Sequence, residues 1–198
     1  MKTLFITKLF YRLFYLFLIA IFLLRISVSF SMETQDSKGL FSLVGKEYGI
    51  DPDLLYSIAV VESSVVAKDR KGFIRPYPWT LRTNRPIYAN SRKEAEKHLK
   101  NLLAQGKQVD VGLMQINTKW HLHRVKSPEE LLDPSNNLRI AAEILNEQIR
   151  RTPQDVFLAV GNYHSYDPDR ARWYARHVFR VYTKIKTKHA QKSIRSPR

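Results

Sequence analysis

The helix predicted over residues 52–63 places one carboxylate on an apolar face. Leu55, Ile58, Ala59 and Glu62 lie at positions i, i+3, i+4 and i+7, which share one side of a helix. A carboxylate that continues a buried face loses hydration, and this raises its pKa. A carboxyl with a raised pKa is what a general acid needs to protonate a glycosidic oxygen near neutral pH. The alternative is a glutamate at a helix end that turns to solvent or pairs with an arginine.

A second segment, residues 110–117, combines a glycine with polar amides at alternating positions. Gly112 permits a close backbone approach or an unusual φ/ψ pair. Gln115 and Asn117 offer donors and acceptors suited to sugar hydroxyl and acetamido groups. The alternative is an ordinary turn whose core residues are Leu113, Met114 and Ile116.

A third segment, residues 159–165, ends a predicted helix. The Tyr163 hydroxyl there could reach a catalytic carboxyl, while Asn162 and Ser165 could meet a substrate. Taken alone, the segment is also typical of a helix C-terminus with an aromatic core anchor.

Together, in this order and spacing, the three segments resemble the SLT-type lytic transglycosylases. The resemblance covers about residues 40–183 and depends on Glu62-Ser63, on the run from Gly112 to Gln115, and on the run from Gly161 to Tyr163. It implies a mostly α, goose-type lysozyme-like single domain with a small β-like excursion. It also implies a lyase that cleaves peptidoglycan glycan strands.

The resemblance implies a route with one carboxylate. Glu62 would protonate the oxygen between N-acetylmuramic acid and N-acetylglucosamine, then act as a base while the muramic C6 hydroxyl attacks C1. The product would be a 1,6-anhydro sugar, with Gln115 and Tyr163 positioning Glu62 and the substrate. The residues expected to bind substrate are Ser63, Gly112, Leu113, Met114, Gln115, Asn117, Asn162, Tyr163, His164 and Trp79.

Two features refine the resemblance. The family's third motif usually has asparagine where this chain has His164. The segment 77–81 ahead of residues 110–112 is similar to the specialised enzymes encoded with conjugation, pilus and secretion systems, in particular those of integrative elements. Apparatus proteins are therefore expected partners. Trp79, Tyr77 and Trp120 could stack on sugar rings, or serve as packing of the insertion and core.

Helix signals surround these segments. Asp51-Pro52, Asp133-Pro134, Thr152-Pro153 and Asp167-Pro168 each pair a capping residue with proline at the first helical position, and Ser91 to Glu94 forms a capping box. We expect an irregular or short-strand insertion over residues 72–90, and a short extended or turn segment over residues 109–117. The helices expected are 37–48, 52–63, 91–105, 133–151, 153–163 and 168–186.

The first 31 residues have the order of a secretory signal peptide: a cationic start, the apolar run 13–24 and the small residues Ser29 and Ser31. An uncleaved anchor that contacts the membrane is the second interpretation, because no alanine marks a cleavage site. Either way we expect an exported, periplasmic protein. The expected organisation is residues 1–31 as leader, 32–186 as the lytic transglycosylase domain and 187–198 as a basic flexible tail.

Composition limits the partners and cofactors. The formal net charge is +15, and removing the four cations of the leader leaves 15 − 4 = +11, which favours an anionic partner such as the cell wall. The cations are spread along the chain, and together with export this disfavours nucleic acid. Without cysteine there is no thiolate metal site, and the His121 and His123 pair lacks an acid at a useful spacing. We expect no metal and no cofactor.

Other functions stay open on the residues alone. A muramidase that uses water would need a second acid, for which Asp110 or Asp69 near Glu62 would be the candidates, although Asp110 is better explained as a brace of the turn before Gly112. A non-catalytic peptidoglycan-binding or assembly protein is a further alternative, which the intact pair of Glu62 and Gln115 disfavours.

Overall fold

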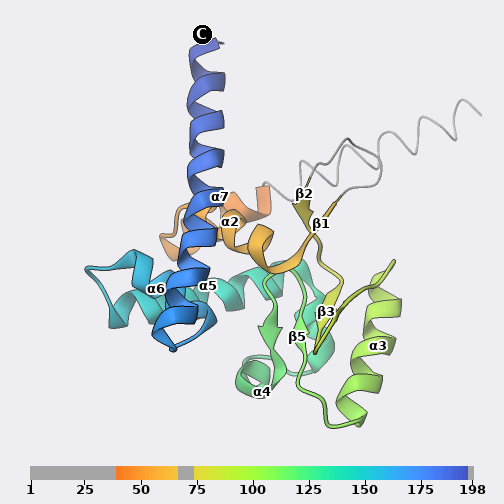
Figure 1. The fold of residues 1–198 in the computed structure, drawn as a ribbon. Helices are drawn as coiled ribbons and strands as arrows, with labels where there is room; N and C mark the ends of the chain where they lie inside the picture. Colours follow the sequence, from red (N-terminus) through yellow and green to blue (C-terminus); the bar gives the residue numbers. More distant parts are fainter. Residues whose placement is uncertain (1–38, 67–73, 196–198) are drawn as a thin grey trace, which may run out of the picture. The chain divides into compact units, whose positions relative to one another are not determined.

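Helices dominate the computed structural model, which describes residues 39–66 and 74–195 (Figure 1). This confirms the mostly α fold with a small β excursion that the sequence predicts. The leader at residues 1–31 and Asp69 lie outside the described residues. After a first helix over residues 39–48, the helices are α2 (Pro52–Ser63), α3 (Arg92–Ala104), α4 (Thr118–His121), α5 (Pro134–Arg151), α6 (Val156–His164) and α7 (Pro168–Arg195), with 3-10 turns η1 (Leu122–Arg124) and η2 (Pro128–Leu132).

Local capping explains where several helices begin. The side chains of Asp51, Ser91 and Asp133 each accept a hydrogen bond from a backbone N–H in the first turn, at 2.8, 3.2 and 2.9 Å. Such caps satisfy amides that the helix itself leaves unbonded. The predicted starts of α2, α3 and α5 are confirmed.

The start of α6 differs from the prediction. The helix begins at Val156 rather than at residue 153, because Asp155 is its cap and accepts a hydrogen bond from the Leu158 N–H at 2.7 Å. The hydroxyl of Thr152, the expected cap, instead donates to the Gln148 carbonyl at 3.0 Å and so closes the end of α5.

The last helix, α7, is longer than expected. It continues to Arg195 instead of ending near residue 186, so the boundary predicted at 187 falls inside a helix. No glycine or proline interrupts the sequence between Pro168 and Arg195, and its long, unbranched cations favour helix. The segment that holds His121 and His123 forms α4 and η1.

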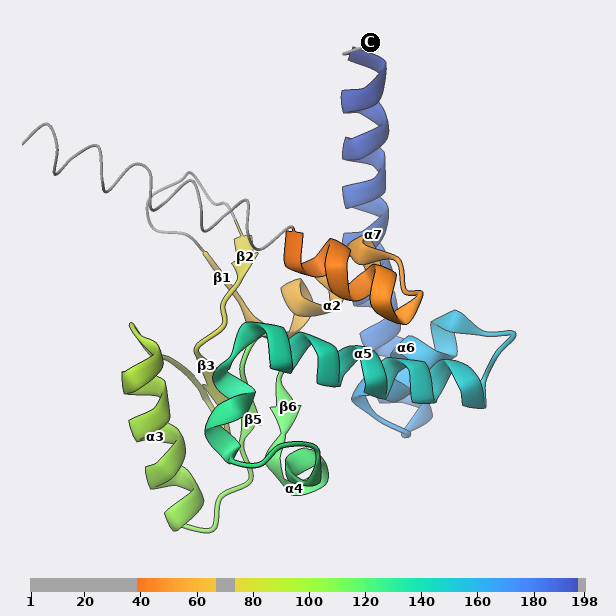
Figure 2. The ribbon, with the colours of Figure 1, turned by 180° about the vertical axis from the view of Figure 1, so that it is seen from behind.

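The strands form two small antiparallel sheets. One pairs β1 (Ser64–Val66) with β2 (Ile74–Pro76), which confirms short strands in the insertion. The other has the order β4-β3-β5-β6, in which Leu81 faces Ile87 on one side and Val111 on the other. β6 contacts both α4 and α5 (Figure 2). The strands of this sheet are β3 (Thr80–Arg82), β4 (Pro86–Tyr88), β5 (Asp110–Val111) and β6 (Ile116–Asn117).

The core lies where α7 packs on α6 and α2, and where α5 packs on α6. Leu55, Leu145 and Val178 are fully buried there, and each contributes about 1.5–3 kcal/mol through burial. Gly161 lets the backbones of α6 and α7 approach, since a Cβ at this position would lie 2.8 Å from the Ala171 carbonyl oxygen. This packing brings the C-terminal end of α2 against α7. None of the helices in the described part of the chain is long and apolar enough to cross a membrane.

Candidate active site

A cavity of about 240 Å³ opens at the C-terminal end of α2. Its walls come from β3, the β5–β6 hairpin, α4, α5 and α6, so the residues that line it are far apart in the sequence. Acidic, amide, imidazole and aromatic groups all contribute. The lining residues are Glu62, Arg82, Asp110, Gln115, Ile116, Asn117, Trp120, His121, Ile144, Tyr163 and His164.

Glu62 is the buried acid of this cavity, with 8% of its surface exposed. Burial raises its pKa from 4.5 to about 7, against the lowering effects of the Tyr174 hydrogen bond and the Arg82 charge. The charge of Asp110 raises the pKa further. Arg82 also donates to the Glu62 carbonyl at 3.0 Å and fixes the end of the helix. The sequence-based expectation of a partly desolvated carboxyl is confirmed.

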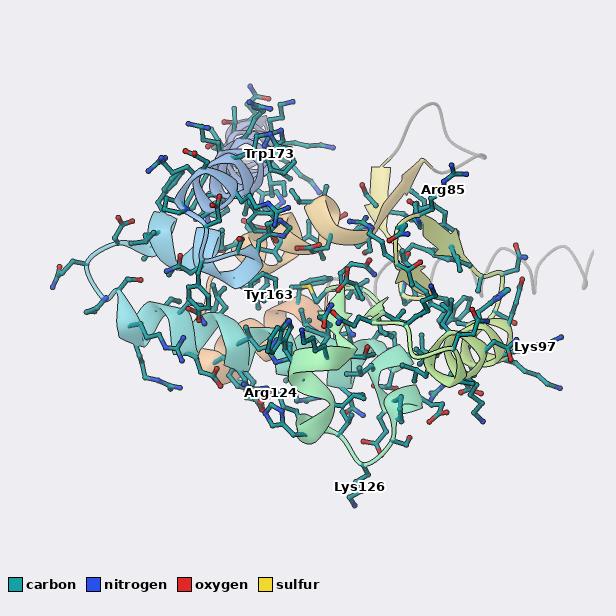
Figure 3. All side chains as sticks on the ribbon, turned by 60° about the horizontal axis from the view of Figure 1, so that its bottom comes forward. Arg85, Lys97, Arg124, Lys126, Tyr163 and Trp173 are labelled. Atoms are coloured by element: carbon teal, nitrogen blue, oxygen red, sulfur yellow. The ribbon has the colours of Figure 1, made fainter. Side chains whose placement is uncertain are left out.

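The hydroxyl bonded to this carboxyl comes from Tyr174 on α7, not from Tyr163. Tyr174 donates to Glu62 Oε1 at 2.6 Å, and burial holds the pKa of its phenol well above the ordinary value, so it remains a donor. Tyr163 donates instead to the Met114 carbonyl at 2.9 Å and ties α6 to the β5–β6 hairpin. Figure 3 shows Tyr163 between the ribbons of α6 and this hairpin. The prediction that Tyr163 reaches the carboxyl was wrong, because α7 brings a second tyrosine closer.

His164 follows Tyr163 at the end of α6 and faces the same tyrosine of α7. Its ring stacks on Tyr174 with centroids 4.6 Å apart and planes within 4°. Partial burial and the charge of Arg170 lower the pKa of the imidazole, which favours the neutral ring near pH 7. The residue that departs from the family pattern therefore lines the cavity and packs on the partner of Glu62.

The turn between β5 and β6 has an unusual backbone. Gly112 has φ +82°, and a Cβ on it would lie 2.6 Å from Asn137 Nδ2 and 2.7 Å from the Leu131 carbonyl oxygen. Asn137 is fully buried and accepts from the Met114 N–H at 2.7 Å while it donates to the carbonyls of Val111 and Leu131. Glycine is needed here for both conformation and space.

Gln115 also adopts a positive φ, at +50°, a conformation that costs a non-glycine residue about 1–3 kcal/mol. Its Nε2 donates to the carbonyls of Gly112 at 2.9 Å and Thr80 at 3.2 Å. Its Oε1 is buried without a hydrogen-bond partner among the described residues. The side chain is thus held at the cavity with one acceptor unused, which suits an N–H or O–H of a bound molecule.

Asp110 and Asn117 face each other across the hairpin. The Asn117 amide donates to Asp110 Oδ1 at 2.7 Å, while its oxygen caps α4 through the Lys119 N–H at 2.9 Å. The expectation that Asp110 braces the turn is confirmed, and both side chains also line the cavity.

Six of the predicted substrate contacts do not line the cavity. Ser63 is buried; its hydroxyl donates to the Leu113 carbonyl at 2.7 Å and accepts from the Tyr77 N–H at 3.2 Å, so it links α2 to the hairpin and the insertion. Trp79 packs edge-on against Tyr77 with ring centroids 5.8 Å apart. Ser63 and Trp79 therefore contact protein groups outside the cavity lining. The six are Ser63, Gly112, Leu113, Met114, Asn162 and Trp79.

Sequence reasoning missed several groups around the site. Trp120 is not among them, because the sequence already offers it for stacking on sugars; it lines the cavity, is 62% exposed, and has Lys119 Nζ 4.4 Å from the centroid of its ring. His121 has a buried Nδ1 without a partner in the described structure, and burial lowers its pKa. The sequence pattern of α7 places Tyr174 among the apolar residues of one helix face and so indicates that it is buried. The pattern does not show that its hydroxyl bonds to Glu62. The other missed residues are Arg82, Asn137 and Ile144.

Within residues 39–66 and 74–195, no three or more His, Asp or Glu side chains come together in a way that could hold a metal ion. The His121 and His123 rings are 6.4 Å apart and tilted, without an acid completing a site. The cavity itself offers a carboxyl whose pKa is raised to about 7, surrounded by hydrogen-bonding groups.

A mostly helical domain with small antiparallel sheets and a buried acid at the end of one helix is consistent with a lysozyme-like domain. The family model of the Transglycosylase SLT domain matches residues 40–180, and the chain belongs to this family. The members of this family are lytic transglycosylases, so the domain implies lytic transglycosylase activity on peptidoglycan. A comparison with curated proteins gives no match.

Proposed function

We propose that this chain is itself an active lytic transglycosylase that cleaves the β-1,4 bond between N-acetylmuramic acid and N-acetylglucosamine, with Glu62 as its acid and base. The observation that carries the proposal is the state of Glu62, which is buried at the cavity and has a pKa of about 7. An acid of this pKa is partly protonated near neutral pH, so one group can both donate and accept a proton.

In the first step, protonated Glu62 gives its proton to the glycosidic oxygen as the bond from that oxygen to C1 breaks. The muramic acetamido group can stabilise the positive charge at C1. Tyr174 donates to Glu62 Oε1 at 2.6 Å and stabilises the carboxylate that this step leaves behind.

In the second step, ionised Glu62 takes the proton of the muramic C6 hydroxyl as that oxygen bonds to C1. The product is 1,6-anhydromuramic acid, no water is consumed, and Glu62 returns to its protonated state. Burial favours this return, because it raises the free energy of the charged carboxylate.

The other groups of the cavity would bind and orient the glycan. Gln115 offers the unused Oε1 acceptor, Asn117 lies beside it on the hairpin, and the exposed ring of Trp120 can stack on a sugar. Tyr163 and the backbone of Met114 hold the hairpin against α6. Their role is to keep the glycosidic oxygen near Glu62.

Digestion of purified peptidoglycan sacculi tests the proposal. The wild-type chain should release anhydro-muropeptides that mass spectrometry identifies, and Glu62→Gln should release none. Glu96→Gln changes a half-buried acid of α3 that pairs with Arg92 and does not line the cavity; it is the matched control and should keep full activity. Wild-type protein that binds sacculi but leaves them intact would contradict the proposal and favour a non-catalytic role.

A hydrolase on the same fold is a second candidate, favoured by one observation. Asp110 lines the cavity with Glu62, and its charge raises the pKa of that carboxyl, so a second acid is close enough to interact. A hydrolase would give reducing ends and incorporate oxygen from labelled water, whereas the anhydro product contains none. If Asp110 acts as a base on water, Asp110→Asn should abolish cleavage; if it only braces the hairpin, anhydro products should persist.

We further propose that the protein is exported to the periplasm and acts locally on the wall during assembly of a conjugation, pilus or secretion apparatus. The signal-peptide pattern of residues 1–31 and the insertion at residues 77–81 support this proposal. Fractionation of cells that express the full chain should recover it outside the cytoplasm, and co-purification from them should yield apparatus proteins. Recovery from the cytoplasm alone would contradict export.

A further inference from the structure

One side of α7 carries an exposed tryptophan and a row of cations. Trp173, Arg176, Arg180 and Lys184 follow at i, i+3, i+7 and i+11, so they lie on the same side of the helix. All four are exposed, Trp173 to 53%. In Figure 3, where α7 is seen nearly end-on, Trp173 is labelled on this helix. We call these four residues the basic face of α7; the expectation that the cations are only spread along the chain does not hold for this helix.

The charges of the basic face are not neutralised within the described structure. Arg176, Arg180 and Lys184 form no ion pair in the part of the chain that the structure describes. After Asp169 the sequence contains no acid at all. A row of like charges without counter-charges attracts an external polyanion.

A different side of the same helix is tied to the domain. Lys186 pairs with Asp51 at 3.1 Å and with Asp53 at 3.5 Å, and Tyr182 donates to Asp51 at 2.7 Å. These contacts hold α7 on α2 while leaving the basic face outward. The row of cations is therefore carried by a helix of fixed orientation.

Trp173 gives the face a second property. Its ring packs on His177 with centroids 4.1 Å apart, and His177 Nδ1 lies 2.8 Å from the Trp173 carbonyl oxygen. The indole is held at the surface by its own helix, with no burial in the core. An exposed indole beside arginines is typical of contact with lipid headgroups, where the ring is apolar on its faces and polar at its N–H.

We propose that the basic face of α7 docks on an anionic phospholipid surface. From Trp173 to Lys184 the face extends about 16 Å along the helix axis, which allows several headgroups to contact it at once. The cations attract the phosphates and the indole enters the headgroup layer. This inference goes beyond the proposed cleavage of glycan and does not depend on it.

Docking in this way leaves the cavity free. The side chain of Tyr174 is buried in the core and hydrogen-bonded to Glu62, whereas the side chains of Trp173 and Arg176 are exposed to solvent. One helix thus presents one side to a membrane and holds the candidate catalytic carboxyl with another. The enzyme would then work on glycan strands next to the membrane.

Vesicle co-sedimentation tests the docking surface, with the full chain in every sample so that the N-terminal segment contributes equally. Vesicles of phosphatidylcholine are compared with vesicles that also contain phosphatidylglycerol. Each surface cation is worth about fivefold in affinity for anionic lipid, so the triple variant Arg176→Gln, Arg180→Gln, Lys184→Gln should bind anionic vesicles about 100-fold more weakly.

A matched control removes the same number of charges elsewhere. Lys93, Lys97 and Lys107 are exposed on or just after α3, away from α7, and Figure 3 shows Lys97 pointing outward there. Changing these three to glutamine should leave most of the binding to anionic vesicles. Equal losses in both triple variants would mean that only net charge matters and would overturn the assignment to α7.

Fluorescence separates lipid from other polyanions. Anionic vesicles should shift the tryptophan emission of the wild type to shorter wavelength, and Trp173→Phe should remove the shift. About 1 M salt, which shortens the Debye length to about 3 Å, should weaken binding. If the basic face instead retains duplex DNA, and anionic vesicles neither bind nor shift the emission, the surface recognises nucleic acid and the lipid proposal fails.

Discussion

Replacing Glu62 by glutamine should stabilise the folded protein, and by an amount that grows with pH. The carboxyl has a pKa of 4.5 in an ordinary environment and about 7 in the folded state, because burial disfavours its ionised form. Ionised Glu62 therefore opposes folding. Glutamine has a similar shape, can still accept the hydrogen bond from Tyr174, and never ionises.

The magnitude follows from the two pKa values. Between pH 4.5 and pH 7 the folded state keeps a proton that the unfolded state has lost, so the free energy of unfolding falls as pH rises. The difference of 7 − 4.5 = 2.5 pH units corresponds to about 3 kcal/mol at 1.36 kcal/mol per unit. The loss is complete above pH 7 and absent below pH 4.5.

Urea unfolding of wild type and Glu62→Gln, measured across this pH range, gives the difference directly. Every other titrating group is common to both proteins and cancels, and a constant offset from the amide does not change with pH. The variant should gain about 3 kcal/mol relative to wild type between pH 4.5 and a pH above 7. Glu96→Gln, at the ion pair with Arg92, should show no comparable trend.

A difference between wild type and Glu62→Gln that stays constant with pH would refute this reasoning. It would mean that the carboxyl ionises as easily in the folded as in the unfolded chain. The proposed acid would then be almost fully ionised at neutral pH, and the chemistry assigned to it would lose its physical basis. Stabilisation with loss of cleavage is instead the expected trade between stability and activity.

Three further substitutions test the surroundings of the carboxyl. Tyr174→Phe removes a hydrogen bond that lowers the pKa of Glu62. In a plot of cleavage rate against pH, the alkaline limb should therefore move to higher pH by about one unit or more. An unmoved limb would contradict the assignment of Glu62 as the acid. In Gly112→Ala the new Cβ would clash with Asn137 and a backbone carbonyl, and the residue would keep a positive φ. Urea unfolding should show that the free energy of unfolding falls by about 2–4 kcal/mol. A fall of less than about 1 kcal/mol would mean that the turn relaxes. Asn137→Ala removes three hydrogen bonds to buried backbone groups, so thermal unfolding should show a loss of stability comparable to that of Gly112→Ala or larger. An unchanged melting temperature would refute this.

The sequence alone determined the features that depend on neighbours along the chain. Asp51, Ser91 and Asp133 mark helix starts because their side chains bond amides two or three residues away. The period of apolar residues placed Glu62 on the buried side of α2 for the same local reason. The order of the motifs was enough to identify the family.

Two helix boundaries could not be placed correctly from the local sequence. Thr152 and Asp155 are both suitable caps, and the choice between them depends on how α5 ends against α6. The end of α7 was placed too early because a run of cations resembles a tail, although nothing in it breaks a helix.

Only the tertiary structure decided which groups meet the carboxyl. Tyr174 is 112 residues from Glu62, and Asn137 is 23 residues from the Met114 amide that it holds. Both tyrosines, 163 and 174, have a suitable hydroxyl, and the packing of α6 and α7 gives one to Met114 and the other to Glu62. Residue type and spacing predict that a side chain is buried. The partner of a buried polar group depends instead on which helices pack together, and the packing free energy that decides this comes from contacts throughout the core.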